Sequence, residues 1–526
     1  MRTKTDFNYL QVILLSLGKT LILVCSIIVA GFMSFLSLKS TGYMKLDITQ
    51  TTIFTKNNIV FYFILIVGFV LISLITKHLE KISSTILFIG GTCIFLAIGL
   101  FLAENAGEVI RSDPGAVLKT AIEINNGNFS SFEKIDHTHY MATFPTQMGL
   151  LTLFRLYTIF TSNPEDLFRL QVFLVCVSNF LLWQIANLLF EKRAISNLVI
   201  LLSHLFLPSI FLTLWIYGDI PGLVFILLSL YFYIHYSKQK KIIFFFLSTI
   251  CITIACLIRA NYLIFLILLL LLQVVELIKK PSIMICISML ILPVSYTISN
   301  NSIHNYYEKK IQNEITYPSQ KAWIVMGLND KVASPGYWDG YTNFIREWNN
   351  YNDEQTEQAV NRDLNERMQA LKTNPKYAQQ FFYNKINVTW NEPTFQSIFV
   401  GPLEAYGQST ETNSLNDLYS EGPLYNIYNK YMAVIVSLIY LSTLISALLQ
   451  LLSRTKDYNF LLLVPYIYLI GGFSFHLFWE VKSRYVFPYV YLLILLCATN
   501  FYFFGNKIFE YKHLLLVNKI RKRRRR

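Results

Sequence analysis

The stretch KKIIFFFLSTICITIACLIRANYLIFLILLLLLQVVELIKK, residues 240–280, determines the class of fold. It contains two apolar runs, 242–258 and 260–278, which are separated by Arg259. Each run is long enough to cross the hydrocarbon core of a bilayer, roughly 30 Å thick, as a helix. Lysines lie at both ends of the stretch, and basic residues collect on the cytoplasmic side of membrane helices. The stretch therefore predicts a helical hairpin with Arg259 in its outer turn.

Similar apolar runs recur along all 526 residues, of which 54% are hydrophobic and only 15% are charged. A soluble domain carries about 25% charged residues, so this composition excludes a soluble enzyme, a secreted module and a disordered protein. We predict an all-α polytopic membrane protein with about twelve transmembrane helices. These are expected at residues 20–38, 59–76, 84–103, 170–190, 194–213, 220–236, 242–258, 260–278, 282–299, 431–452, 460–479 and 485–504.

The short basic loops indicate the orientation of the chain. With twelve crossings they all lie on one side, together with both termini, and the positive-inside rule makes that side the cytoplasm. A further apolar stretch, 141–160, would move most of these loops outside if it crossed, so we expect it to be an interfacial or re-entrant helix. The first outer loop also carries lysines, and the first hairpin fits the rule least well. The basic loops contain Lys77 and Lys81, Lys192 and Arg193, Lys238, Lys240 and Lys241, Lys279 and Lys280, and Arg454 and Lys456.

This topology predicts four parts of the chain. Residues 1–299 form a transmembrane region with a first external loop at 104–140, and residues 300–429 form a small extracytoplasmic domain with a polar helix near 353–371. Residues 430–505 form the last transmembrane helices, and 506–526 form a basic cytoplasmic tail. The tail contributes to the net charge of +13. A run of basic residues beside a membrane span binds anionic lipid. The lipid bilayer is therefore the expected partner, and nucleic acid is not.

The sequence lacks the common motifs of soluble cofactors. It has no Walker A motif, no dinucleotide glycine fingerprint and no HExxH metal motif. All seven cysteines lie in apolar segments, which suggests neither a disulfide framework nor a zinc site. Chemistry on the outer face of the membrane would therefore need an activated donor that is carried by a lipid.

Asp113 is the most informative acid of the first external loop. It lies in the sequence Ser112-Asp113-Pro114-Gly115, at the start of a helix that we expect to end at Asn125. Asp is a favourable N-cap, and Pro is favourable just inside a helix. Capping of this helix is thus the structural alternative to a role in catalysis.

Four short stretches resemble the GT-C membrane glycosyltransferases, which include the protein O-mannosyltransferase-like and aminoarabinose-transferase-like families. Residues 112–127 resemble their loop of Asp, then Ala, then Gly, and YMATFP (140–145) resembles the Tyr/Pro-rich segment that follows. The stretches YGDIP (217–221) and EVKSRY (480–485) lie where these families have polar residues. Pro114 stands where the families have a second acid, so no cofactor is certain, and a requirement for a divalent metal stays open.

The resemblance implies a GT-C fold and the transfer of a sugar from a polyprenyl-phosphate donor to a hydroxyl of an extracytoplasmic glycan or cell-wall polymer. Asp113 would act as the general base for the acceptor hydroxyl. Arg484, Lys482 and Arg259 would bind the donor phosphate. The alternative for these three cations is snorkelling towards the membrane surface, with no ligand.

Asp219, Tyr140 and Glu480 are further candidate members of the site. An acid at membrane depth, such as Asp219, usually has a partner or a function. The Ile-, Lys- and Asn-rich composition and the absence of cysteine from 300–429 indicate a bacterial plasma membrane. Two other functions stay open, namely a transporter or flippase of lipid-linked saccharides and a polysaccharide polymerase or ligase.

Overall fold

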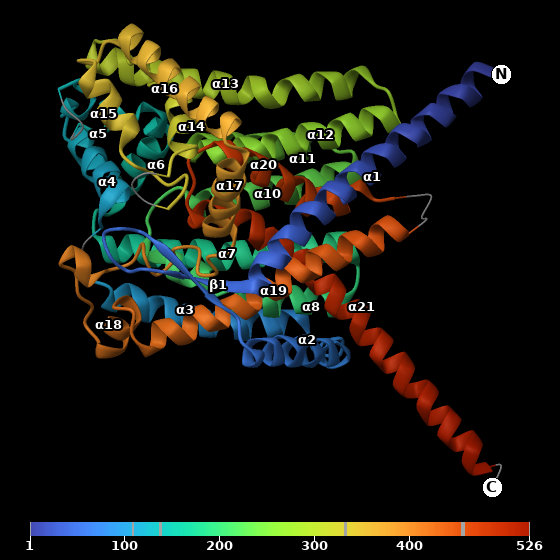
Figure 1. Cartoon of the computed structure of the whole chain (residues 1–526). Helices are drawn as coiled ribbons and strands as arrows, with labels where there is room; N and C mark the ends of the chain where they lie inside the picture. The colour runs from blue at the N-terminus through green and yellow to red at the C-terminus, as the bar shows by residue number, and fades with distance from the viewer. Residues whose placement is uncertain (1, 108–109, 136–138, 331–333, 454–457, 525–526) are drawn as a thin grey trace.

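The computed structural model describes residues 2–107, 110–135, 139–330, 334–453 and 458–524, with the backbone alone at 2–9, 509 and 511–524. Most of it is helical (Figure 1). The first half contains α1 (Arg2–Lys39), α2 (Ile59–Leu79), α3 (Ser84–Asn105), α4 (Ser112–Asn125), α5 (Tyr140–Thr143), α6 (Met148–Phe160), α7 (Pro164–Phe190), α8 (Arg193–Leu205), α9 (Pro208–Phe211), α10 (Asp219–Gln239) and α11 (Ile242–Ile258). The second half contains α12 (Leu263–Lys279), α13 (Ile283–Ile311), α14 (Lys321–Gly327), α15 (Tyr341–Trp348), α16 (Asp353–Thr373), α17 (Pro375–Trp390), α18 (Asn413–Tyr419), α19 (Pro423–Leu452), α20 (Val464–Phe478) and α21 (Ser483–Arg524).

Ten helices of the described chain are long and apolar enough to cross a membrane, as in a multi-pass membrane protein. They are α1, α2, α3, α7, α10, α13, α19 and α21, and α12 and α20 each with the turn before it. An eleventh span would be the pair Arg193–Leu205 and Pro208–Leu214, which is bent by 50°. The α11 helix is apolar but has only 17 residues. The expected total of twelve needs both of these to cross, and it stays a prediction.

Several helices extend beyond the apolar runs that predicted them. The α13 helix continues from residue 299 to Ile311, α19 begins at Pro423 instead of 431, and α21 continues into the basic tail. Hydropathy marks only the part of a helix that lies in hydrocarbon. Residues 300–311 contain neither Gly nor Pro, so nothing in the local sequence ends α13 at the edge of its apolar run.

The two ends of the helix bundle differ. Both chain termini lie at one end, on the right in Figure 1, while α4, α5, α15, α16 and α18 lie at the other. Both long polar segments are therefore at the same end, opposite the termini, as the charge pattern predicts. We name this the loop end; which side of the membrane it faces stays a prediction.

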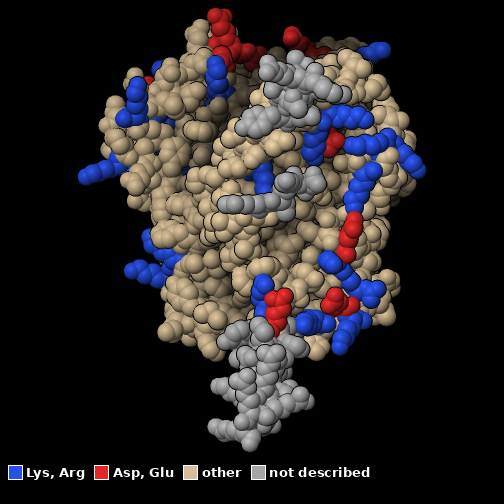
Figure 2. All heavy atoms as spheres, turned by 90° about the vertical axis from the view of Figure 1, so that its right-hand side faces the viewer, with Lys and Arg blue, Asp and Glu red and all other residues tan. Residues whose placement is uncertain are grey.

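The opposite end of the bundle is basic. Figure 2 shows this face, on which Lys and Arg side chains gather with few acids among them. Two of the lysines pair with acids of neighbouring helix ends, Lys238 with Glu191 at 3.2 Å and Lys240 with Glu276 at 2.9 Å. Arg454 and Lys456 lie outside the described residues. The exposed basic residues of the short loops are Lys77, Lys81, Lys192, Arg193, Lys238, Lys240, Lys241, Lys279 and Lys280.

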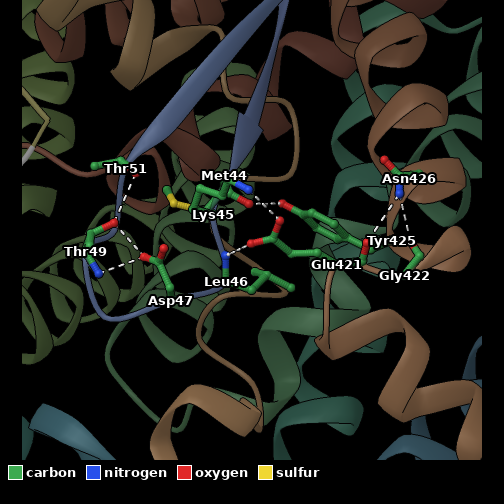
Figure 3. A network of polar contacts seen from close by, with 10 residues as sticks. All are labelled: Met44, Lys45, Leu46, Asp47, Thr49, Thr51, Glu421, Gly422, Tyr425 and Asn426. Atoms are coloured by element: carbon green, nitrogen blue, oxygen red, sulfur yellow. Dashed lines mark hydrogen bonds and ion pairs between the residues drawn. The ribbon is translucent and has the colours of Figure 1, made fainter.

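The first outer loop forms a β-hairpin, which the all-α prediction missed. Strands β1 (Ser40–Met44) and β2 (Thr52–Lys56) pair antiparallel. Figure 3 shows how its tip is held: the Lys45 Nζ lies 3.1 Å from the Glu421 carboxylate, whose other oxygen accepts the Leu46 N–H at 2.8 Å. Tyr425 donates its hydroxyl to the Met44 carbonyl at 2.7 Å. A lysine of this loop thus has an acidic partner in the second polar segment.

The first long polar segment carries α4, and α5 and α6 follow it. The helix that begins at Ser112 has Arg111 at its N-cap position, with no side-chain cap hydrogen bond. Asp113 lies in the first turn, so its prediction as the N-cap was wrong. The α6 helix has 13 residues and is not among the helices long enough to cross, in line with the expected non-crossing helix at 141–160.

The second long polar segment has small cores of its own and a part that joins the main core. One small core contains Ala322, Val325, Ile345, Ala359 and Val360, and another contains Leu328, Leu371 and Phe381. The polar helix expected near 353–371 is α16. By contrast, the buried, irregular residues from Phe395 to Leu403 pack in the main core. The segment is therefore firmly attached to the bundle, while its domain boundaries stay predictions.

Candidate functional site: a charged cluster at the loop end

The cluster forms where several helices begin or end. Asp219 is the first residue of α10, and Arg259 directly follows α11. A Cβ atom on Gly218 would lie 3.0 Å from the Ile258 carbonyl oxygen and 3.2 Å from the Arg259 Cβ. Glycine at this position therefore allows the two helix ends to approach closely, which brings Asp219 beside Arg259.

Asp219 is the centre of a buried ion-pair group. Its Oδ1 lies 2.5 Å from Arg259 Nη1, and its Oδ2 lies 3.7 Å from Arg484 Nε. The side chains of Asp219 and Arg484 are only 2% and 3% exposed. Burying a charge is costly unless an opposite charge compensates it. Burial lowers the pKa of Arg259, but the Asp219 carboxylate and the neighbouring tyrosines together outweigh burial and raise that pKa above its ordinary value.

Aromatic rings surround the two guanidinium groups. The Arg484 guanidinium lies 4.3 Å from the centre of the Trp215 ring, and the Arg259 guanidinium lies 4.8 Å from the Tyr485 ring and 5.4 Å from the Tyr217 ring. A cation over an aromatic face within about 6 Å is attracted by the ring quadrupole. The rings orient both cations and leave their hydrogen-bonding edges available.

Arg484 and Lys482 keep unused hydrogen-bonding capacity. Within the described part of the chain, neither side chain donates a hydrogen bond, although the Arg484 Nε is buried. Burial and the neighbouring Arg484 lower the pKa of Lys482, while Glu480 and Asp113 act in the opposite direction. Two adjacent cations without acceptors are a suitable site for an anion.

Asp113 faces the same cluster from the first turn of α4. Its half-buried carboxylate accepts no hydrogen bond and forms no ion pair with any residue that the structure describes. Its negative charge acts on Tyr140, Tyr217 and Lys482. Burial, and next the charge of Asp113, raise the pKa of Tyr140, whose hydroxyl is paired with that of Tyr217. The Asp113 carboxylate is therefore available to a ligand.

Glu480 lies on the connector between α20 and α21, next to the cations. It is 5% exposed and accepts a hydrogen bond from the Tyr485 hydroxyl at 3.3 Å. Burial raises the pKa of Glu480, while Lys482 and Arg484 act in the opposite direction. An acid here compensates part of the positive charge of its neighbours.

The structure brings all seven predicted site residues into one cluster. Ion pairs join Asp219, Arg259 and Arg484 directly, and close electrostatic interactions link the remaining four to them. The roles given to these residues stay predictions. The remaining four are Asp113, Tyr140, Glu480 and Lys482.

The sequence analysis missed Arg111 and Trp215. Arg111 Nε donates to the Gly401 carbonyl at 3.2 Å, and its guanidinium lies 4.3 Å from the Tyr406 ring. Its charge acts on Arg484 and Lys482. Arg111 could have been found from the sequence, because it lies two residues before Asp113. No signal in the sequence pointed to Trp215, because its ring contacts Arg484, a residue far away in the sequence.

A small crevice adjoins the cluster. Arg111 and Trp215 form part of its wall, so it reaches the ring that supports Arg484. Its other walls come from α3, α7 and the irregular stretch after α17. They are formed by Ala106, Ile110, Phe168, Leu214, Val400, Gly401, Pro402 and Gln408.

Among the residues that the structure describes, no three His, Cys, Asp or Glu side chains come together as a metal-binding group. The three acids of the cluster are instead near cations. A divalent metal thus remains an open part of the prediction.

Comparison with known proteins finds no relative: no family model, no curated protein and no solved structure matches the chain. The resemblance to GT-C glycosyltransferases therefore depends on the short motifs and on the chemistry of the cluster that those motifs form.

Proposed function

We propose that the chain is a GT-C-type glycosyltransferase, which moves a sugar from a polyprenyl-phosphate donor to the hydroxyl of an extracytoplasmic acceptor such as a glycan or cell-wall polymer. One observation carries the proposal. At the loop end, the carboxylate of Asp113, which has no hydrogen-bond partner among the described residues, lies near Lys482 and Arg484, whose side chains donate no hydrogen bond to any described residue.

These groups match the two requirements of sugar transfer from a lipid phosphate. Asp113 takes the proton of the acceptor hydroxyl while the acceptor oxygen forms a bond to the anomeric carbon of the sugar. The bond between that carbon and the phosphate oxygen breaks, and the polyprenyl phosphate leaves with an additional negative charge. Lys482 and Arg484 stabilise this charge as it develops, which lowers the barrier of the step.

The position of the cluster suits a donor with a lipid tail. Its residues lie at helix ends, where a phosphate at headgroup depth leaves its tail in hydrocarbon. The proposal includes that the chain crosses a bacterial plasma membrane twelve times and that both termini are cytoplasmic.

The position also favours an enzyme over a transporter. Secondary transporters hold their substrate near the bilayer midplane, between two halves that alternate. Here the charged residues lie at helix ends, beside α4 and beside the connector that contacts the second polar segment. A polymerase or ligase would share the outer site and differs in its donor and product.

The test is a transfer assay with purified protein in nanodiscs. Labelled polyprenyl-phosphate sugars are offered singly with glycan and cell-wall acceptors, and polyprenyl-diphosphate oligosaccharides are offered in parallel. We expect transfer of one sugar per turnover from a monophosphate donor. Transfer of whole oligosaccharides from the diphosphate donor would indicate a polymerase or ligase. Movement of lipid-linked saccharide across vesicles without a new glycosidic bond would indicate a flippase.

A further inference from the structure

The connector between α20 and α21 carries the cations of the site, and it is held by the second polar segment. The Glu480 N–H donates to the Trp323 carbonyl at 3.1 Å, and the Val481 N–H donates to the Gly336 carbonyl at 2.8 Å. These bonds fix the backbone immediately before Lys482. The two acceptor residues belong to the stretches around α14 and the turn that follows it.

Lys385 of α17 adds a second attachment to the same connector. Its side chain is 1% exposed, and its Nζ donates to the carbonyl oxygens of Leu477 at 3.0 Å, of Trp479 at 2.8 Å and of Gly327. Three acceptors use all three N–H donors of an ammonium group. Leu477 and Trp479 are at the end of α20, where the last carbonyls have no partner within the helix. Burial lowers the pKa of Lys385 to about 7, against the charge of Glu480, and in its ammonium form this one side chain joins α17, α14 and the end of α20.

The packing around this attachment leaves little room for movement. A Cβ atom on Gly327 would lie 2.2 Å from the Phe478 carbonyl oxygen and 2.4 Å from the Trp479 carbonyl carbon. The indole rings of Trp323 and Trp479 stack with their centres 6.3 Å apart. The second polar segment and the connector are thus in direct backbone contact.

We propose that Lys385 is a positioning residue, which holds the Trp479–Lys482 connector so that Lys482 and Arg484 face the ligand. This makes the second polar segment a structural part of the site. The part of the inference that concerns donor binding rests on the proposed function; the part that concerns the connector does not.

A second buried cation of the same segment provides an internal comparison. Arg346 of α15 is 1% exposed and donates to the Ala142 carbonyl at 2.6 Å, on the helix that begins with Tyr140. Removing Arg346 should loosen α5 and leave the connector unchanged. A general loss of stability would affect both segments in either variant.

The experiment is amide hydrogen exchange of the full-length protein in nanodiscs, read from peptides that cover 478–483 and 139–144. In Lys385→Met we expect exchange at 478–483 to become about tenfold faster or more, because hydrogen bonds from a charged donor are lost. Exchange at 139–144 should not change. Arg346→Met should give the opposite pattern, and Lys376→Met, at an exposed lysine of α17, should change neither.

A second variant covers the case in which Lys385→Met fails to fold. Lys385→Gln keeps a polar side chain but can make at most two of the three hydrogen bonds, so it should also increase exchange at 478–483. Unchanged exchange of this peptide in a folded Lys385→Met protein, or equal increases in both peptides, would overturn the positioning role. If Lys385→Met does not fold, an unchanged peptide in folded Lys385→Gln overturns it.

Donor kinetics extend the test to the ligand. With an active polyprenyl-phosphate sugar, Lys385→Met should raise the KM for the donor more than it lowers kcat, and Lys376→Met should alter neither. Faster exchange with normal donor kinetics would reject the link to donor binding. If the unmodified protein uses no such donor, the proposed function fails, and the exchange pattern still decides whether Lys385 holds the connector.

Discussion

Replacing Asp113 by Asn distinguishes a catalytic carboxylate from a structural one. Asn keeps the size and polarity of Asp but cannot take a proton. The cost to folding should be small, because Asp113 is not the N-cap and accepts no hydrogen bond from any described residue. Loss of even a true cap costs only about 1 kcal/mol. Loss of a general base lowers the rate by about 10²–10⁴, which corresponds to about 3–5.5 kcal/mol in the barrier.

The assay is the initial rate of sugar transfer by purified protein, measured together with its thermal midpoint in the same detergent. Glu123→Gln is the matched control, because Glu123 is an acid on the same helix whose one ion pair within the described chain is with Lys119, at 3.8 Å. Asp113→Asn should lose at least about a hundredfold in rate with a nearly unchanged midpoint, and the control should keep its rate. Near-normal turnover by folded Asp113→Asn protein would refute the general-base role.

Three further predictions concern topology, pH and stability. A single cysteine at Asn350 should react with an impermeant thiol reagent in intact cells and one at Lys241 should not; the reverse labelling would invert the orientation. Burial lowers the pKa of Lys482 below its ordinary 10.5, so kcat/KM for the donor should fall as pH rises towards 10.5. Lys482→Arg should remove this fall because a guanidinium stays charged. If the pH profile of Lys482→Arg is identical to that of the unmodified protein, Lys482 is excluded as the titrating group. Asp219→Asn should destabilise the protein by about 3–5 kcal/mol, and adding Arg259→Gln should restore part of the lost stability. If the thermal midpoint of the double variant falls by the sum of the two single losses, the pairing is contradicted.

The helices were predictable from the sequence because crossing hydrocarbon requires about twenty apolar residues in a row. Helix ends were less predictable, since a helix such as α13 continues in water until the local sequence ends it. The β-hairpin was missed because its stability comes from Glu421 and Tyr425, far away in the sequence. Hydropathy carries no information on such long-range contacts.

The site residues were predictable to the extent that position alone could place them. Arg259, Asp219 and Arg484 each lie at the outer end of a predicted span, so one cluster was a reasonable expectation. The capping role of Asp113 was wrong because α4 begins at Ser112, whose φ is 57°, which puts Asp113 in the first turn. Lys385 could not have been identified, because a lysine in a polar helix is usually solvated and its burial depends on the end of α20.

The charges of the cluster indicate the kind of ligand that completes it. Its basic side chains are Arg111, Arg259, Lys482 and Arg484, and its acids are Asp113, Asp219 and Glu480. Burial lowers the pKa of Lys482 and raises that of Glu480, so both groups are shifted towards their neutral forms in the free protein. An anion beside Lys482 would favour its ammonium form and would offset the excess of positive charge. A neutral ligand would do neither, and the cost of burying a cation without a partner would remain. This charge balance supports the proposal of a phosphate-bearing ligand, and Asp113 is the one acid of the three with no hydrogen-bond or ion-pair partner in the described chain.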